Sequence, residues 1–249
     1  MTTTDRHFLA LDIETVPHPS LDPSWLPVFT PEDVKLGNLK DAVKIREKVE
    51  EARASFESNL RRKAGLDPDL MMICCCVMYD SHENDWLEMF AKNEEEESEM
   101  LFRVVHSLDL AMKSERTILS YNGRTFDIPA IYRRCQYQDV RFPRALYRKL
   151  TDRYALESHH LDLMQALGMP TPFSSQPVVK KMAYYLSRFG LTPKLEGWSG
   201  ADVWPAFQEG RFDEITAYCR ADVEGLVELY RRVEPWLVDE RRQDNIIKS

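Results

Sequence analysis

Two acidic residues in the stretch "FLALDIETV" lie where an apolar strand is otherwise expected. Asp12 and Glu14 are two positions apart, so a strand would carry both side chains on the same face. Apolar residues on both faces of the run predict a central strand covered on both sides. Two buried like charges repel each other and lose hydration, at a cost of several kcal/mol. A divalent cation would neutralise them, whereas at an exposed strand end they would simply be hydrated.

A third acid follows in "SYNGRTFDIP", between a predicted strand and a predicted helix. Asp127 could cap that helix, with Pro129 in its first turn, and Asn122 could be an ordinary turn residue. By itself, the position of Asp127 favours the capping interpretation.

A fourth acid lies in the predicted helix "ITAYCRADVEGLVELY". Asp222 falls one helical turn after Tyr218, and it could simply pair with an arginine or accept a hydrogen bond from the Tyr218 hydroxyl. Gly225 is unusual inside a helix and predicts a close approach of this helix to the sheet. A cation bound by all four acids explains the three motifs together. The expected core-facing stripe is Ile215, Tyr218, Asp222, Leu226, Leu229 and Val233.

The rest of the chain predicts one α/β domain spanning residues 1–249, with a mixed central sheet flanked by helices. Apolar periodicity predicts a long amphipathic helix from Asn38 to about Arg62, within a helical insertion at about 32–65. The acidic run Glu94–Glu97 is expected to be a solvated first helical turn. Further strands are expected at 7–15, in "MMICCCVMYD", "NDWLEMFA" and "TILSYN", and further helices at 95–112, from 126, at 178–189 and at 213–233, with 137–176 irregular.

Composition narrows the class of protein. The net charge of −8 argues against a broadly basic nucleic-acid coat, although a local cationic surface is compatible with it. No basic flank with a long apolar segment opens the chain, so neither a secretory signal nor a membrane partner is expected. Of the five cysteines, the consecutive Cys74, Cys75 and Cys76 lack the CxxC pairing of a zinc site and predict buried, reduced thiols in a strand of a cytoplasmic protein.

DxE, NxxxFD and YxxxD, in this order, resemble the three motifs of the DEDDy 3′–5′ exonucleases. "NGRTFDIP" and "LEGWSGADVW…GRFDEITAYCRADV" are most similar to stand-alone predicted exonucleases related to the proofreading domain of family B DNA polymerases. The resemblance extends from Phe8 to about Tyr230 and implies a ribonuclease H-like fold.

The resemblance also implies roles for individual residues. The four acids would bind two divalent ions, Mg²⁺ or Mn²⁺, and Tyr218 would orient the attacking water. Asn122 would hydrogen-bond the terminal nucleotide and Phe126 would pack against it, with Thr15 as a further substrate contact. Asp162 in "HHLDLM" resembles a family segment near the site, but a helix cap explains it equally well. The four metal-binding acids are Asp12, Glu14, Asp127 and Asp222.

A basic segment from Arg124 to Arg153 contains eight basic and three acidic residues. Arginines can bind phosphates and aromatic rings can stack on bases, so the segment could bind a single strand. A salt-bridged surface with packed aromatic residues is an equal alternative. The interleaved aromatic residues are Tyr132, Tyr137, Phe142 and Tyr147.

The leading hypothesis is a metal-dependent 3′–5′ exonuclease that hydrolyses single-stranded 3′ ends, with DNA favoured as the polymer. The alternatives are an exoribonuclease of the same superfamily and a non-catalytic nucleic-acid-binding module. The sequence does not decide the sugar, because that discrimination depends on loop contacts to the 2′ hydroxyl. The pathway, the preferred metal, the oligomeric state and the role of the insertion are likewise open.

Overall fold

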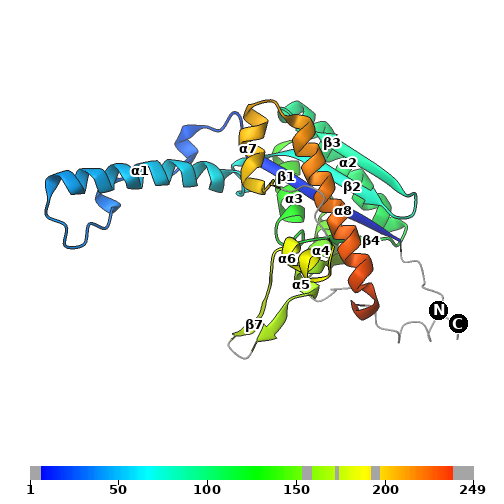
Figure 1. Cartoon of the computed structure of the whole chain (residues 1–249). Helices are drawn as coiled ribbons and strands as arrows, with labels where there is room; N and C mark the ends of the chain where they lie inside the picture. Colours follow the sequence, from blue (N-terminus) through cyan, green and yellow to red (C-terminus); the bar gives the residue numbers. More distant parts are fainter. Residues whose placement is uncertain (1–6, 153–158, 172–173, 192–196, 238–249) are drawn as a thin grey trace, which may run out of the picture.

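A computed structural model describes residues 7–152, 159–171, 174–191 and 197–237. Its centre is a five-stranded sheet with the order β3-β2-β1-β4-β5, in which β1 is the middle strand (Figure 1). β3, β2 and β1 pair antiparallel, whereas β1, β4 and β5 pair parallel. The predicted mixed sheet with a central first strand is confirmed. The strands are β1 (Phe8–Pro17), β2 (Met71–Asp80), β3 (Asp85–Phe90), β4 (Thr117–Ser120) and β5 (His160–Asp162).

The side chains of β1 point alternately to the two faces of the sheet and contribute to an apolar core on each face. Leu9, Leu11 and Ile13 pack in the core beneath α2 (Glu94–Lys113) and α3 (Asp127–Tyr137). On the other face, Phe8, Ala10 and Val16 pack beneath α8 (Phe212–Leu237), which crosses the sheet (Figure 1). Asp12 and Glu14 belong to this α8 face by the same alternation. Together with α8, the helix α7 (Gly200–Gln208) contributes buried side chains to this second core.

The buried stripe of α8 differs in detail from the prediction. Its apolar members Ile215, Leu226, Leu229 and Val233 are buried, but Tyr218 and Asp222 are only partly buried. Cys219 and Val223, one position along, are fully covered instead. The helix is therefore rotated so that Tyr218 and Asp222 lie at the edge of the contact, where they can reach a site open to solvent.

The prediction for Gly225 is wrong about its neighbour. A Cβ at Gly225 would lie 3.1 Å from Leu186 Cδ1, in α6 (Met182–Arg188). The close approach is therefore between two helices, because α6 covers the outer part of α8 where a larger side chain would stand.

The predicted solvated turn at Glu94–Glu97 also needs correction, because Glu97 is fully buried. Its carboxylate accepts two bonds from Arg134, at 2.9 and 2.6 Å, and one from the Ile73 backbone amide at 2.8 Å. Gln138 Nε2 donates to it as well, at 3.1 Å. Glu97 thus joins α2 to β2 and α3, and the bidentate arginine makes burial of its charge tolerable.

Between β1 and β2 the chain forms an arm that extends away from the sheet (Figure 1). Phe29 packs on Phe56 with ring centroids 5.6 Å apart, which holds the irregular first part of the arm against its helix. At the base, Thr15 Oγ1 donates to the Gly65 carbonyl at 2.5 Å, beside the end of β1. The arm contains η1 (Pro23–Trp25), η2 (Pro31–Asp33) and α1 (Ala42–Ala64).

The region predicted to be irregular and the segment after it contain several short elements. Val178 ends a strand, so the helix predicted from 178 begins only at Met182, after the N-cap residue Lys181. α7 was not predicted, although Ser199 and Asp202 form the capping box that announces it. The short elements are α4 (Arg144–Thr151), α5 (Leu163–Ala166), β6 (Met169–Thr171) and β7 (Ser174–Val178).

All five cysteines are buried and free, which confirms the prediction made for Cys74, Cys75 and Cys76. Among the described residues, no helix is both long enough and apolar enough to cross a membrane.

The buried ion pair allows a stability test with a matched neighbour. Arg134→Met would leave the Glu97 carboxylate buried without its guanidinium, and we expect the free energy of unfolding to fall by about 3–5 kcal/mol. Arg133→Met removes an exposed pair with Asp69 and should cost less than about 1 kcal/mol. Denaturant unfolding followed by circular dichroism measures both, and equal losses would contradict the assignment.

Candidate active site

The acids meet where the central strand runs past its parallel neighbour. β4 pairs with β1 only from Phe8 to Ala10 and then ends, so the next part of β1 has no strand on that side. The start of α3 fills this place, and the Ile13 backbone amide donates a hydrogen bond to the Asp127 carboxylate. Asp127 is therefore held against β1 at Ile13, the residue between Asp12 and Glu14.

Asp127 does not cap its helix. It is the first residue of α3, the N-cap position belongs to Phe126, and no side chain caps this end. Burial raises the pKa of Asp127 from its ordinary value of 3.8 to about 7, although its backbone hydrogen bonds oppose that rise. The capping interpretation is thus wrong, and the carboxylate points toward the other acids.

Asp12 and Glu14 lie in a strongly negative environment. Burial raises the pKa of Asp12 well above its usual value, and the charges of Asp127, Glu14 and Asp222 raise it further. Burial likewise raises the pKa of Glu14, where Asp222 is the strongest charged neighbour. Within the described residues, Glu14 accepts no side-chain hydrogen bond although only 9% of it is exposed. Among the residues that the structure describes, no cationic side chain accompanies these carboxylates.

Asp222 and Tyr218 reach the same place from α8. The Tyr218 hydroxyl donates a hydrogen bond to Asp222, while burial raises the pKa of Asp222 to about 6. Burial also raises the pKa of the Tyr218 hydroxyl, and the nearby charges of Asp222, Glu14 and Asp12 raise it further. The Trp198 ring stacks on the Tyr218 ring with centroids 5.8 Å apart. Tyr218 is thereby kept protonated and fixed in orientation.

The turn between β4 and α3 needs a residue without a side chain. A Cβ at Gly123 would lie 2.5 Å from Ser120 Oγ and 3.4 Å from an oxygen of Asp127. Asp162 accepts from the backbone amides of Asn122 and Arg124, at 2.9 and 3.1 Å. Asp162 Oδ1, which accepts from Asn122, also accepts from the Met164 and Gln165 amides at the start of α5, so the capping interpretation is confirmed.

The three predicted substrate contacts lie around this cluster. Asn122 has a left-handed backbone, with φ of 70°, and its side-chain oxygen accepts from Thr125 Oγ1 at 2.5 Å. Phe126 is partly buried and packs on the α2–α3 core, while the Thr15 hydroxyl is engaged by the arm. Their contacts with a nucleotide stay predictions.

A cysteine that was not predicted for the site lies directly beneath it. Cys219 Sγ is 3.5 Å from the Asp12 backbone oxygen and 3.8 Å from Asp12 Oδ2. Cys219, Asp12 and Glu14 each offer one ligand atom, and these atoms lie within 4.8 Å of one another. The sequence could have indicated Cys219 by its position directly after Tyr218, because a helix with residue 218 at the edge of its contact turns residue 219 toward the core.

Much of the predicted basic segment proves to be structural. Arg124 is buried and donates to the carbonyls of Asp152 and His160, while Arg134 binds Glu97. The rings of Tyr132 and Tyr147 stack with centroids 4.0 Å apart and pack with Phe142 against the core. The packed alternative is therefore right for these residues. Arg153 lies outside the described residues. The exposed basic positions of the segment are Arg133, which pairs with Asp69, and Arg141, Arg144, Arg148 and Lys149.

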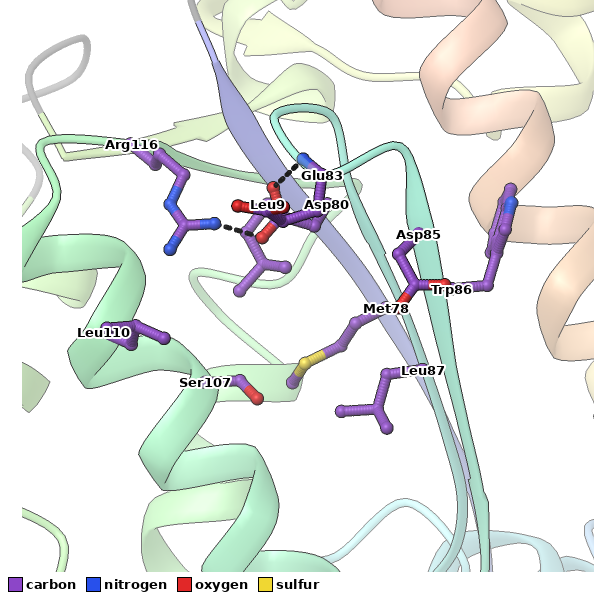
Figure 2. Close-up of a pocket in the computed structure, with 10 residues that line it drawn as sticks. All are labelled: Leu9, Met78, Asp80, Glu83, Asp85, Trp86, Leu87, Ser107, Leu110 and Arg116. Carbon is purple, nitrogen blue, oxygen red and sulfur yellow. Dashed lines mark hydrogen bonds and ion pairs between the residues drawn. The ribbon is translucent and has the colours of Figure 1, made fainter.

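A pocket of about 190 Å³ lies elsewhere, on the α2 side of the β2–β3 hairpin (Figure 2). Figure 2 shows Arg116 paired with Asp80, whose other oxygen accepts from the Glu83 amide. None of the predicted site residues lines this pocket. We therefore place the candidate site at the acid cluster, which brings four carboxylates together, whereas in the pocket Arg116 is paired with Asp80.

Comparison with known proteins gives the family. The sequence profile of predicted 3′–5′ exonucleases related to the exonuclease domain of PolB matches residues 69–237. The chain belongs to this family. In this exonuclease-related chain the matched region contains Asp127, Tyr218 and Asp222, whereas Asp12 and Glu14 precede it. The search of curated proteins gave no match.

The fold is also that of a known structure. The chain is similar to the family B DNA polymerase from the hyperthermophilic archaeon Pyrobaculum calidifontis, with a TM-score of 0.54 and 15% identity. The match covers 94% of this chain and 25% of the polymerase chain. This similarity and the mixed sheet confirm the ribonuclease H-like α/β fold of the exonuclease-related chain.

The raised acid pKa values predict an unusual pH dependence in the presence of a chelator. The folded state binds the Asp127 proton more tightly than the unfolded state, so this stabilisation is present below about pH 4 and lost as pH rises through about 7. We expect the unfolding free energy to fall by a few kcal/mol over this range. Asp127→Asn, measured by thermal unfolding, should remove that part of the fall.

Comparing the two proteins isolates Asp127 from His160, whose pKa burial lowers to about 4 and which contributes the opposite slope. Mg²⁺ or Mn²⁺ should raise the unfolding temperature of the wild type at pH 8 more than that of the variant. Identical pH profiles for the two proteins would contradict the rise in the pKa of Asp127 that its burial causes.

Proposed function

We propose that this chain is a metal-dependent 3′–5′ exonuclease that hydrolyses phosphodiester bonds at the 3′ ends of single-stranded nucleic acid. The observation that carries this proposal is the convergence of Asp12, Glu14, Asp127 and Asp222 from three separate segments, with no cationic side chain among them in the part of the chain that the structure describes. Membership of the exonuclease-related family supports the same reaction class.

The donor set fits divalent metal ions. Carboxylate oxygens are preferred by Mg²⁺ and Mn²⁺, and the Glu14 carboxylate, which has no hydrogen-bond donor among the described residues, could bind one. Asp12 is central to the charge network, since the other three acids all raise its pKa, and it is suited to bridge two ions. When bound, two ions activate water and stabilise the leaving 3′ oxygen in displacement at phosphorus.

The remaining residues position the substrate and the water. Tyr218, fixed by Trp198 and Asp222, would orient the attacking water with its hydroxyl. Thr15, Asn122 and Phe126 would contact the terminal nucleotide. Gly123 and Asp162 set the turn that carries Asn122, so they act as positioning residues.

We favour DNA as the polymer, in keeping with the related exonuclease domain of PolB, and RNA is the alternative. Buried, free thiols agree with a reducing compartment, and we propose the cytoplasm. We further propose that residues 1–249 act as one exonuclease domain carrying the helical insertion.

The direct test uses 5′-labelled single strands of DNA and RNA, each with Mg²⁺, Mn²⁺ or a chelator. We expect a ladder that shortens from the 3′ end with either metal and no reaction with the chelator. Asp12→Asn should remove the activity while keeping the fold. Equal activity in Asp12→Asn would identify a contaminant, and inactivity on both polymers would favour the binding module.

Tyr218→Phe separates orientation of the water from binding of metal. The ring and its stacking on Trp198 stay, but the hydroxyl is lost, so we expect the cleavage rate to fall by about a hundredfold. Single-turnover kinetics at several Mg²⁺ concentrations should show a lower maximal rate with little change in the Mg²⁺ concentration required. A variant as fast as the wild type would exclude this role.

A further inference from the structure

Two thiols lie behind the acid cluster. Cys219 and Cys75 are fully covered, and their side chains hydrogen-bond to each other. Cys75 is the cross-strand partner of Glu14 in the β1–β2 pair, so both side chains belong to the face that α8 covers. Cys219 reaches Asp12 from α8, as described above. Sulfur therefore borders a site whose other donor atoms are carboxylate oxygens.

The Cys219 thiol and two carboxylates are close enough to share one ion. Their ligand atoms lie within 4.8 Å of one another, whereas ligands of a tetrahedral ion at 2.0–2.3 Å are about 3.5 Å apart. An approach of roughly 1 Å, within the reach of side-chain rotations, would close the site. Glu14, nine-tenths buried and without a hydrogen-bond donor among the described residues, is the group that needs such an ion.

This donor set discriminates between metals. Sulfur is a poor ligand for Mg²⁺, but Zn²⁺ and Cd²⁺ bind thiolate and carboxylate together. We propose that Asp12, Glu14 and Cys219 form a binding site for a thiophilic divalent cation that excludes Mg²⁺ from the acid cluster. On binding, the Cys219 thiol proton is released to solvent and the S–metal bond replaces it. Its effect on activity rests on the proposed exonuclease function, but the binding does not.

Binding is tested with Cd²⁺ alone on the full chain. Thiolate coordination produces an ultraviolet charge-transfer band, and we expect it to saturate at one Cd²⁺ per chain in the wild type. Cys135→Ser is the matched control, because Cys135 is buried in the core on the opposite face of the sheet. Cys219→Ser should lose the band and bind Cd²⁺ at least about a hundredfold more weakly by calorimetry.

Asp12→Asn keeps the thiol and provides a second variant, in which we expect weaker Cd²⁺ binding with the band still formed at high concentration. Thermal unfolding of each variant verifies the fold. An unchanged band in folded Cys219→Ser, or no band in the wild type, would overturn the proposed site.

Activity separates this inference from the proposed function. In the wild type, Zn²⁺ at a fraction of the Mg²⁺ concentration should inhibit cleavage. The Zn²⁺ concentration that halves the cleavage rate of each protein should be at least about tenfold higher for Cys219→Ser. A wild type that shows the Cd²⁺ band but no cleavage would refute the exonuclease and leave the site standing. Cleavage without the Cd²⁺ band would refute the site and leave the exonuclease standing.

Discussion

Mutual repulsion among four carboxylates is the constraint around which this molecule is arranged. Asp12, Glu14, Asp127 and Asp222 share a largely buried space, and burial with neighbouring negative charge raises the pKa of Asp12 and Glu14 well above normal. Such an arrangement opposes folding unless protons or cations neutralise it. The fold keeps these charges together, and this cost is the strongest physical argument that the cluster has a function.

The other buried charges make the contrast clear. Glu97 is neutralised by Arg134, Asp162 accepts several backbone amides, and Arg124 donates to carbonyl oxygens. Among the buried polar groups that the structure describes, Glu14 lacks a comparable partner. Within the described residues, the buried charges of Glu97, Asp162 and Arg124 are thus compensated by the protein, whereas that of Glu14 is not.

Several features with no chemistry of their own keep the acids in position. β1 outruns β4, which leaves the Ile13 amide for Asp127. Gly123 lets the turn pass close to Ser120, and the edge position of Asp222 on α8 leaves room beside Cys219. The thiols of Cys75 and Cys219 lie behind Asp12, and Cys219 is the residue that we propose to favour a thiophilic cation.

The sequence by itself determined the strand with two acids on one face and the main strands and helices around it, because period-two and period-3.6 patterns are local. The resemblance to the family came from three short motifs in a fixed order. It also identified the four acids. Only the tertiary structure decided that Asp127 turns away from its helix, that Glu97 is buried, that Tyr132 and Tyr147 pack inward, and that Cys219 rather than Tyr218 faces the core. Each of these outcomes depends on a partner far along the chain, such as the Ile13 amide or Arg134. No local pattern encodes such a contact, because the rotation of a helix is set by the surface on which it packs.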